Sequence, residues 1–179
     1  GRLAQPVNLS LGRRIYESYK SDPLCLAVEA VWRAGIVVVV AAGNDGRDNS
    51  MGTFGYGTIN SPANDPLVIT VGAMKTNTTG PRGDDTIASY SAKGPTMVDH
   101  IVKPDIVAPG NQVVSLLSSP TSLLATSHPE LRIPVSYYAS STTGTLSNSY
   151  IKMSGTSMAT PVVSGAVAVL LQKEPSLTP

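Results

Sequence analysis

Residues 36–44 read IVVVVAAGN, and this stretch decides the fold class of the chain. Its first seven residues are apolar and five of them are β-branched, which is typical of a strand buried on both faces. Such strands belong to parallel sheets that helices cover. Ligands of open α/β sheets bind at the carboxyl ends of the strands, where Asn44 offers an amide donor. Asn-Asp-Gly is also common turn chemistry, so the stretch leaves the role of Asn44 open.

The residues before this strand predict a βαβ unit. Residues 6–11 alternate between apolar and polar, which predicts a strand. A helix is expected next, with Ser21 or Asp22 as its cap and Gly35 just beyond its end. Its apolar stripe would be formed by Leu24, Ala27, Val28, Val31 and Trp32. Strand, helix and strand with short links form a βαβ unit.

The residues after the strand predict more of the sheet and a second helix. Further strands are expected at 67–73 and, more weakly, at 112–117, while 43–66 and 74–111 are expected to be loops. A helix over 157–173 is apolar nearly all round, which predicts that it is buried. Its stripe would be formed by Val163, Ala166, Val167, Leu170 and Leu171. We therefore expect an α/β fold of three layers, with a mostly parallel, incomplete sheet and helices on both faces.

A serine stands where this last helix is expected to begin. A loop with Gly155 leads to Ser157, and free backbone N–H groups and the positive end of the helix dipole gather at such a helix start. These groups would stabilise a negative oxygen that develops next to Ser157. The alternative is that Ser157 or Thr156 only caps the helix. The residues alone leave both readings open.

Several segments, in order along the chain, resemble the subtilisin family. Residues 155–161, GTSMATP, resemble its nucleophile motif, and residues 41–44, AAGN, resemble its oxyanion-asparagine segment. Residues 8–12, NLSLG, resemble its substrate-pairing strand. Counterparts also exist for residues 61–63, 68–73 and 103–110. The resemblance covers nearly the whole chain except residues 118–149, and residues 1–179 are therefore identified as part of a subtilisin-like peptidase domain.

This resemblance implies a serine endopeptidase that hydrolyses peptide bonds. Ser157 would attack the carbonyl carbon, and its own N–H and the Asn44 side chain would hold the oxyanion. The residues that would bind the polypeptide substrate are Ser10, Leu11 and Gly12, which would pair with its backbone, and Ala41, Ala42 and Gly43, which would line a side-chain pocket. Small residues in that pocket imply broad specificity with room for a large apolar side chain.

The partners that activate such a serine are missing from the expected places. The family order is Asp, His and Ser, yet nothing like the first two precedes Asn44. The chain has two histidines, His100 and His128, and both are expected in surface loops. The sequence therefore predicts a fragment that is inactive by itself and needs the N-terminal part of the catalytic domain as a partner. Unpaired strand edges in such a fragment would favour self-association.

The composition argues against nucleic acid and membranes as partners of this chain. The net charge of +1 gives no electrostatic reason to expect nucleic acid as a partner. No apolar run approaches the roughly 20 residues of a membrane helix, so no membrane partner is expected. The chain opens without a signal peptide, and a secreted or extracellular location is implied only by the resemblance.

The sequence predicts neither a disulfide nor an assigned metal site. The single Cys25 excludes an internal disulfide and is expected to be a buried structural thiol. No cofactor is required for the chemistry, although structural calcium is possible in this family. The loop aspartates that could bind it are Asp45, Asp48, Asp65, Asp84 and Asp85. Their spacing fits no EF-hand loop, so no residue is assigned to a metal.

Residues 118–149 are rich in serine and threonine and predict a surface insertion, with a hairpin around residues 133–139. The sequence leaves two alternative classes of function. An α/β-hydrolase requires a glycine where Ala159 stands after the serine. The stronger alternative is a non-catalytic domain, derived from a subtilase, that binds peptides or proteins without cutting them.

Overall fold

The structure is a computed structural model that describes residues 6–140 and 144–179. The chain forms two compact units, one of Gly1–Asn111 with Gly155–Pro179 and the other of Gln112–Ser154. Residues 141–143, which belong to the predicted insertion, lie outside the described residues. None of the helices in the described part of the chain is long and apolar enough to cross a membrane.

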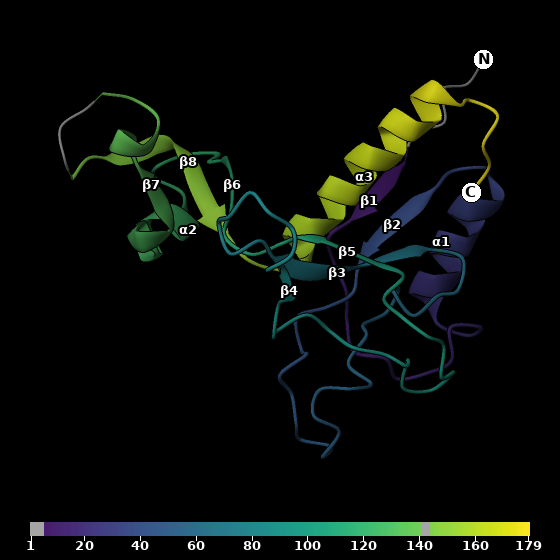
Figure 1. Ribbon diagram of the computed structural model, residues 1–179. Helices are drawn as coiled ribbons and strands as arrows, with labels where there is room; N and C mark the ends of the chain where they lie inside the picture. The colour runs from purple at the N-terminus through teal and green to yellow at the C-terminus, as the bar shows by residue number, and fades with distance from the viewer. Residues whose placement is uncertain (1–5, 141–143) are drawn as a thin grey trace. The chain divides into compact units, whose positions relative to one another are not determined.

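The first unit is built on a five-stranded sheet that is mostly parallel (Figure 1). Its parallel strands are β1 (Val7–Leu9), β2 (Val38–Ala41), β3 (Ile69–Lys75) and β5 (Ile106–Pro109). The short strand β4 (Thr86–Ile87) pairs antiparallel with the end of β3. Because β2 lies between β1 and β3, the valine-rich stretch is an inner strand of the sheet, as predicted.

Two helices, α1 (Pro23–Arg33) and α3 (Thr156–Lys173), cover opposite faces of this sheet (Figure 1). Successive side chains of a strand point to opposite faces. Val39 packs in one core cluster with Val163 of α3. Val38 and Val40 pack in another cluster with Val28 of α1. The alternation along β2 thus sends neighbouring valines to different helices, and the predicted three-layer arrangement is confirmed.

The ends of α1 follow the predicted chemistry. Asp22 caps the helix by accepting a hydrogen bond from the Leu24 N–H at 2.9 Å, and Pro23 occupies the first position. Gly35 follows the helix with a φ of 82°, a backbone conformation that favours glycine. The turns of the βαβ unit are therefore set by residues that are local in sequence.

The buried face of α1 is rotated from the predicted stripe. Cys25 and Val28 are buried, whereas Leu24 and Ala27 are exposed. On this buried side the Cys25 thiol donates to the Asn64 Oδ1 at 3.3 Å.

The prediction that α3 is buried all round is wrong for the described part of the chain. One side of the helix packs on the sheet through Ala159, Val163 and Leu171. Val162 and Leu170, on the other side, are exposed. The sheet can cover only one side of a helix, and no other described element covers the rest.

The loop predicted over 74–111 contains two strands that the sequence analysis missed, β4 and β5. Both are short, and β5 ends in a proline. Ile106 at the start of β5 is exposed, so the segment lacks the apolar run that revealed β2. Pairing with β3 rather than local pattern makes it a strand.

The second unit is a small antiparallel sheet with strand order β6-β8-β7. Its elements are β6 (Val113–Leu116), α2 (Leu123–Ser127), η1 (Pro129–Leu131), β7 (Arg132–Pro134), η2 (Val135–Tyr137) and β8 (Leu146–Met153). The weak strand predicted at 112–117 is β6, although it is largely exposed. No hairpin forms within 133–139, because Pro134 leads into a 3₁₀ turn and β7 pairs with β8 instead.

Candidate active site

Ser157 lies in the first turn of α3, on a tightly fixed turn. The Gly155 N–H donates to the Gly110 carbonyl at 2.8 Å, and the Tyr90 hydroxyl donates to the same carbonyl at 2.8 Å. Burial raises the pKa of Tyr90, so this hydroxyl stays protonated as a donor. The Ser157 N–H makes no hydrogen bond with any described residue. A free backbone donor therefore lies beside the serine hydroxyl.

The Asn44 side chain is held in one orientation by Thr156. Its Oδ1 accepts from the Thr156 N–H at 2.9 Å and from the Thr156 hydroxyl at 3.2 Å. A backbone N–H can only donate, which identifies the bonded atom of the amide as its oxygen. The Asn44 Nδ2 makes no hydrogen bond within the described residues, so the amide presents a free donor.

Ser157 and Asn44 line one cleft of about 370 Å³ in the first unit. The lining residues are Ser10, Leu11, Gly12, Ala41, Gly43, Asn44, Asp45, Asn60, Thr156 and Ser157. The structure thus brings together the two predicted catalytic residues and five of the six predicted substrate-binding residues. Ala42 is the exception, because its side chain is fully buried in the core cluster on the α1 side of the sheet.

Three residues of the cleft were missed by the sequence analysis: Thr156, Asn60 and Asp45. Thr156 is next to the serine, and its Oγ1 also accepts from the Gly43 N–H at 3.2 Å. Asn60 lies so close to Gly43 that a Cβ on that glycine would meet the Asn60 Nδ2 at 2.7 Å. A glycine in the sequence can indicate that another residue packs closely against the backbone, but it does not indicate which residue that is.

The hydroxyl of Ser157 has no general base beside it in the described residues. Its Oγ donates to the Ser10 carbonyl at 3.3 Å, and the Ser10 hydroxyl donates to the Ser157 carbonyl at 2.9 Å. A carbonyl oxygen cannot take the proton of an attacking serine. His100 and His128 are both exposed, as predicted, and neither lines the cleft.

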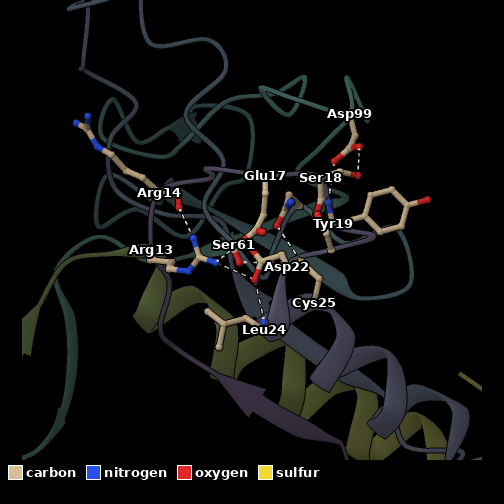
Figure 2. A network of polar contacts seen from close by, with 12 residues as sticks. Arg13, Arg14, Glu17, Ser18, Tyr19, Asp22, Leu24, Cys25, Ser61 and Asp99 are labelled. Carbon is tan, nitrogen blue, oxygen red and sulfur yellow. Dashed lines mark hydrogen bonds and ion pairs between the residues drawn. The ribbon is translucent and has the colours of Figure 1, made fainter.

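An ion-pair network fixes the segment that leads out of the cleft (Figure 2). The Arg13 backbone exchanges two hydrogen bonds with Ser61, at 2.9 and 2.8 Å. The Arg13 guanidinium lies 3.0 Å from Asp22, which is fully buried, and 3.2 Å from Glu17. Arg13 therefore joins the end of the predicted substrate-pairing segment to the cap of α1.

Two of the loop aspartates have partners within the protein. Asp48 forms an ion pair with Arg14 at 3.0 Å, and Asp84 accepts from the Thr79 hydroxyl at 2.9 Å. No group of three or more potential metal ligands occurs in the part of the chain that the structure describes.

Cys25 is expected to resist alkylation in the folded protein. Burial, reinforced by the nearby Asp22 carboxylate, raises the pKa of its thiol from 9.0 to about 12, and the thiolate is the reactive form. Iodoacetamide at pH 9 should leave the native protein unmodified and label it in denaturant, as mass spectrometry would show. Labelling at equal rates in both states would contradict this assignment.

An α/β fold that gathers a serine hydroxyl and an asparagine amide in one cleft has the features of a serine hydrolase. The model of the Subtilase family matches residues 4–179, so the chain belongs to this family. The family resemblance inferred from the sequence motifs is thereby confirmed.

Similar proteins support this family assignment and show its extent. Serine protease AprX from Bacillus subtilis (strain 168) is 44% identical over 164 residues, which are 92% of this chain and 32% of that protein. Subtilisin DY from Bacillus licheniformis is 33% identical over 172 residues, 96% of this chain and 44% of that protein. The solved structure of Sphericase matches with a TM-score of 0.60 at 27% identity, covering 96% of this chain and 44% of its own. The chain thus spans less than half the length of these relatives.

Proposed function

We propose that this chain is the nucleophile-bearing part of a subtilisin-type serine endopeptidase. Ser157 is the nucleophile, and the Ser157 N–H and Asn44 Nδ2 form the oxyanion hole. The observation that carries this proposal is that both donors lack partners among the described residues while they share a cleft with the serine hydroxyl. Free donors that share one cleft with the nucleophile are what a developing oxyanion requires.

The reaction follows from these positions. The Ser157 Oγ attacks the carbonyl carbon of the peptide bond, and its proton passes to a general base. The carbonyl oxygen becomes the oxyanion and is stabilised by the two donors, while Thr156 keeps the Asn44 amide pointing toward it. Collapse of this intermediate breaks the peptide bond, and the base returns the proton to the leaving amine. Water then releases the acyl group from Ser157.

The base and its carboxylate come, in this proposal, from residues outside the 179 of this chain. His100 and His128 are the two histidines of the sequence, and neither lines the cleft. The N-terminal part of a subtilase catalytic domain is the partner that would supply both groups. The chain without that partner is expected to lack peptidase activity.

The substrate is a polypeptide. Ser10, Leu11 and Gly12 would pair with its backbone as an added strand. Ala41 and Gly43 line the side-chain pocket, with Asn60 as a further wall that the sequence did not reveal. Ala42 contributes backbone only, since its side chain is buried. We carry over secretion from the family as the proposed location.

A fluorophosphonate probe tests the proposed function. The protein should be tested at its full natural length, because the probe reacts only with an activated serine. We expect Ser157 to be labelled and the Ser157→Ala variant to be unlabelled, with peptide mapping by mass spectrometry as the readout. Ser154→Ala, which removes an exposed serine three positions earlier, is the matched control and should be labelled normally.

One observation favours a second function, a non-catalytic peptide-binding domain. The Ser157 hydroxyl is bonded to a backbone carbonyl rather than to a base. If folded full-length protein is not labelled at Ser157 but still binds peptides, the endopeptidase proposal fails and the binding domain takes its place.

A further inference from the structure

Residues 10–12, the predicted substrate-pairing segment, are held at their two ends and not in between. All three residues line the catalytic cleft and are exposed. Among the described residues, no hydrogen bond involves the N–H or the carbonyl of Leu11 or Gly12. These groups are therefore free to pair with a peptide backbone, and their position depends on what holds the two ends of the segment.

The first end of the segment is fixed by the strand before it and by the serine of the cleft. Leu9 pairs with Val40 in the parallel sheet. The Ser10 hydroxyl donates to the Ser157 carbonyl at 2.9 Å, and the Ser10 carbonyl accepts from the Ser157 hydroxyl at 3.3 Å. This end is thus anchored to both the sheet and α3.

The second end of the segment is fixed by Arg13. The Arg13 N–H and carbonyl both bond to Ser61, and the two residues form an isolated antiparallel bridge. Gly12 packs so closely at this point that a Cβ on it would meet the Asn60 Cβ at 3.0 Å and the Ser61 carbonyl at 3.2 Å. Because Gly12 is covalently linked to Arg13 and its backbone makes no hydrogen bond with the described residues, a shift of Arg13 displaces Gly12 as well.

The Arg13 guanidinium contacts three acceptors, and one of them is buried (Figure 2). It lies 3.0 Å from the Asp22 Oδ1, 3.2 Å from the Glu17 Oε1 and 3.2 Å from the Arg14 carbonyl. The Asp22 side chain is 0% exposed, and no other cation of the described residues pairs with it. Asp22 is itself held by the Leu24 N–H that it caps. Since an ionised carboxylate in the interior requires a charged partner, Asp22 fixes where the guanidinium lies.

The side chain of Arg13 supplies what its backbone alone does not. The two bonds to Ser61 use backbone groups, which every residue except proline offers. A guanidinium adds a planar fork of N–H donors that contacts several acceptors at once. These contacts tie residue 13 to the start of α1 and to the loop that follows it. The arginine therefore fixes the orientation of the segment as well as its end point.

We propose that Arg13 is a positioning residue for the substrate: its ion pair with the buried Asp22 keeps residues 10–12 in place for pairing with a polypeptide backbone. The proposal rests on the proposed function for its substrate. Arg13 does not line the cleft, so it acts through residues 10–12 and not on the reacting atoms. A segment that is loose in the free protein must be ordered when the peptide binds, which weakens the binding of substrate and transition state alike.

Cleavage of an internally quenched peptide, one phenylalanine among seven alanines, by the full-length protein tests this role. Arg13→Ala should raise KM by about tenfold, which corresponds to ordering about one backbone residue, and change kcat by about twofold or less. Arg14→Ala is the matched control, because this side chain is 66% exposed, and it should leave both constants unchanged. Adding Asp22→Asn to Arg13→Ala removes the unpaired buried charge and restores stability, but the guanidinium is still absent, so KM should stay raised.

The outcomes separate positioning from structural support and from the proposed function. Circular dichroism shows which variants are folded, and if Arg13→Ala is not, the double variant alone decides. If the double variant has the KM of the unmodified protein, Arg13 has only a structural role, and the endopeptidase stands. If the unmodified protein does not cut the peptide, the endopeptidase fails, and fluorescence anisotropy of the labelled peptide on the Ser157→Ala variant decides the role of Arg13. Binding that the two further substitutions weaken by about tenfold supports the positioning role; equal binding, or no binding to either protein, overturns it.

Discussion

Replacing Asn44 by aspartate is expected to lower kcat of the full-length protein by about 10²–10³ and to leave KM nearly unchanged. The loss of such a donor in a subtilisin has an effect of this size. Aspartate keeps the Oδ1 that accepts from Thr156, but it replaces the N–H₂ donor by an acceptor oxygen with a negative charge, so a loss at the upper end of this range is expected. An interaction made in the transition state, and not in the bound substrate, affects kcat and not KM.

A second substitution distinguishes the Asn44 donor itself from the Thr156 hydroxyl that orients it. Thr156→Val removes the hydroxyl that bonds to the Asn44 Oδ1 but retains the backbone N–H, so a smaller loss of kcat is expected. Circular dichroism should show that both variants are folded. The oxyanion-hole assignment of Asn44 fails if Asn44→Asp keeps the activity of the unmodified protein, or if its loss is confined to KM.

Local structure made Ser157 and Asn44 candidates, and the resemblance to the subtilisin family then assigned their expected roles. Asn44 follows the strand with the strongest apolar run, and Ser157 stands at the start of a long apolar helix. The carboxyl end of a parallel strand and the start of a covering helix lie at the same edge of the sheet. Two local predictions thus placed two distant residues in one cleft.

The prediction for Ala42 was wrong because the sequence does not show which face of the sheet a strand side chain points to. Ala41 and Ala42 are adjacent and both small, yet only Ala41 lines the cleft. Successive strand residues point to opposite faces, and a continuous apolar run gives no sign of which residue points where. Asn60 was missed for a different reason, since its position depends on close packing against Gly43.

A cavity of about 290 Å³, which shares Asp45 and Asn60 with the catalytic cleft, could not be predicted from the sequence for a related reason. Its walls come from residues 14–16, segment 45–60 and Met97, which the fold brings together from well-separated parts of the chain. Tyr16 and Met97 stand in segments without apolar periodicity, where isolated large side chains are ordinary.

Replacing Arg13 by alanine is expected to destabilise the protein by roughly 2–3 kcal/mol. Removing one partner of a fully buried ion pair costs roughly 3–5 kcal/mol, because the remaining charge is left in the interior. The lower figure applies here because the Arg13 side chain is 35% exposed, although Asp22 is 0% exposed. The measurement is the shift of the urea unfolding midpoint at constant slope.

The neighbouring arginine provides the matched control. The Arg14 side chain is 66% exposed and pairs with Asp48, whose side chain is 28% exposed, so Arg14→Ala should cost roughly 0–1 kcal/mol. Adding Asp22→Asn to Arg13→Ala should recover most of the lost stability, because asparagine removes the unpaired charge and keeps the acceptor for the Leu24 N–H. If the two arginine variants have the same unfolding midpoint, or if adding Asp22→Asn recovers no stability, Arg13 does not neutralise a buried charge. In that case only the backbone hydrogen bonds to Ser61 hold the substrate-pairing segment in place.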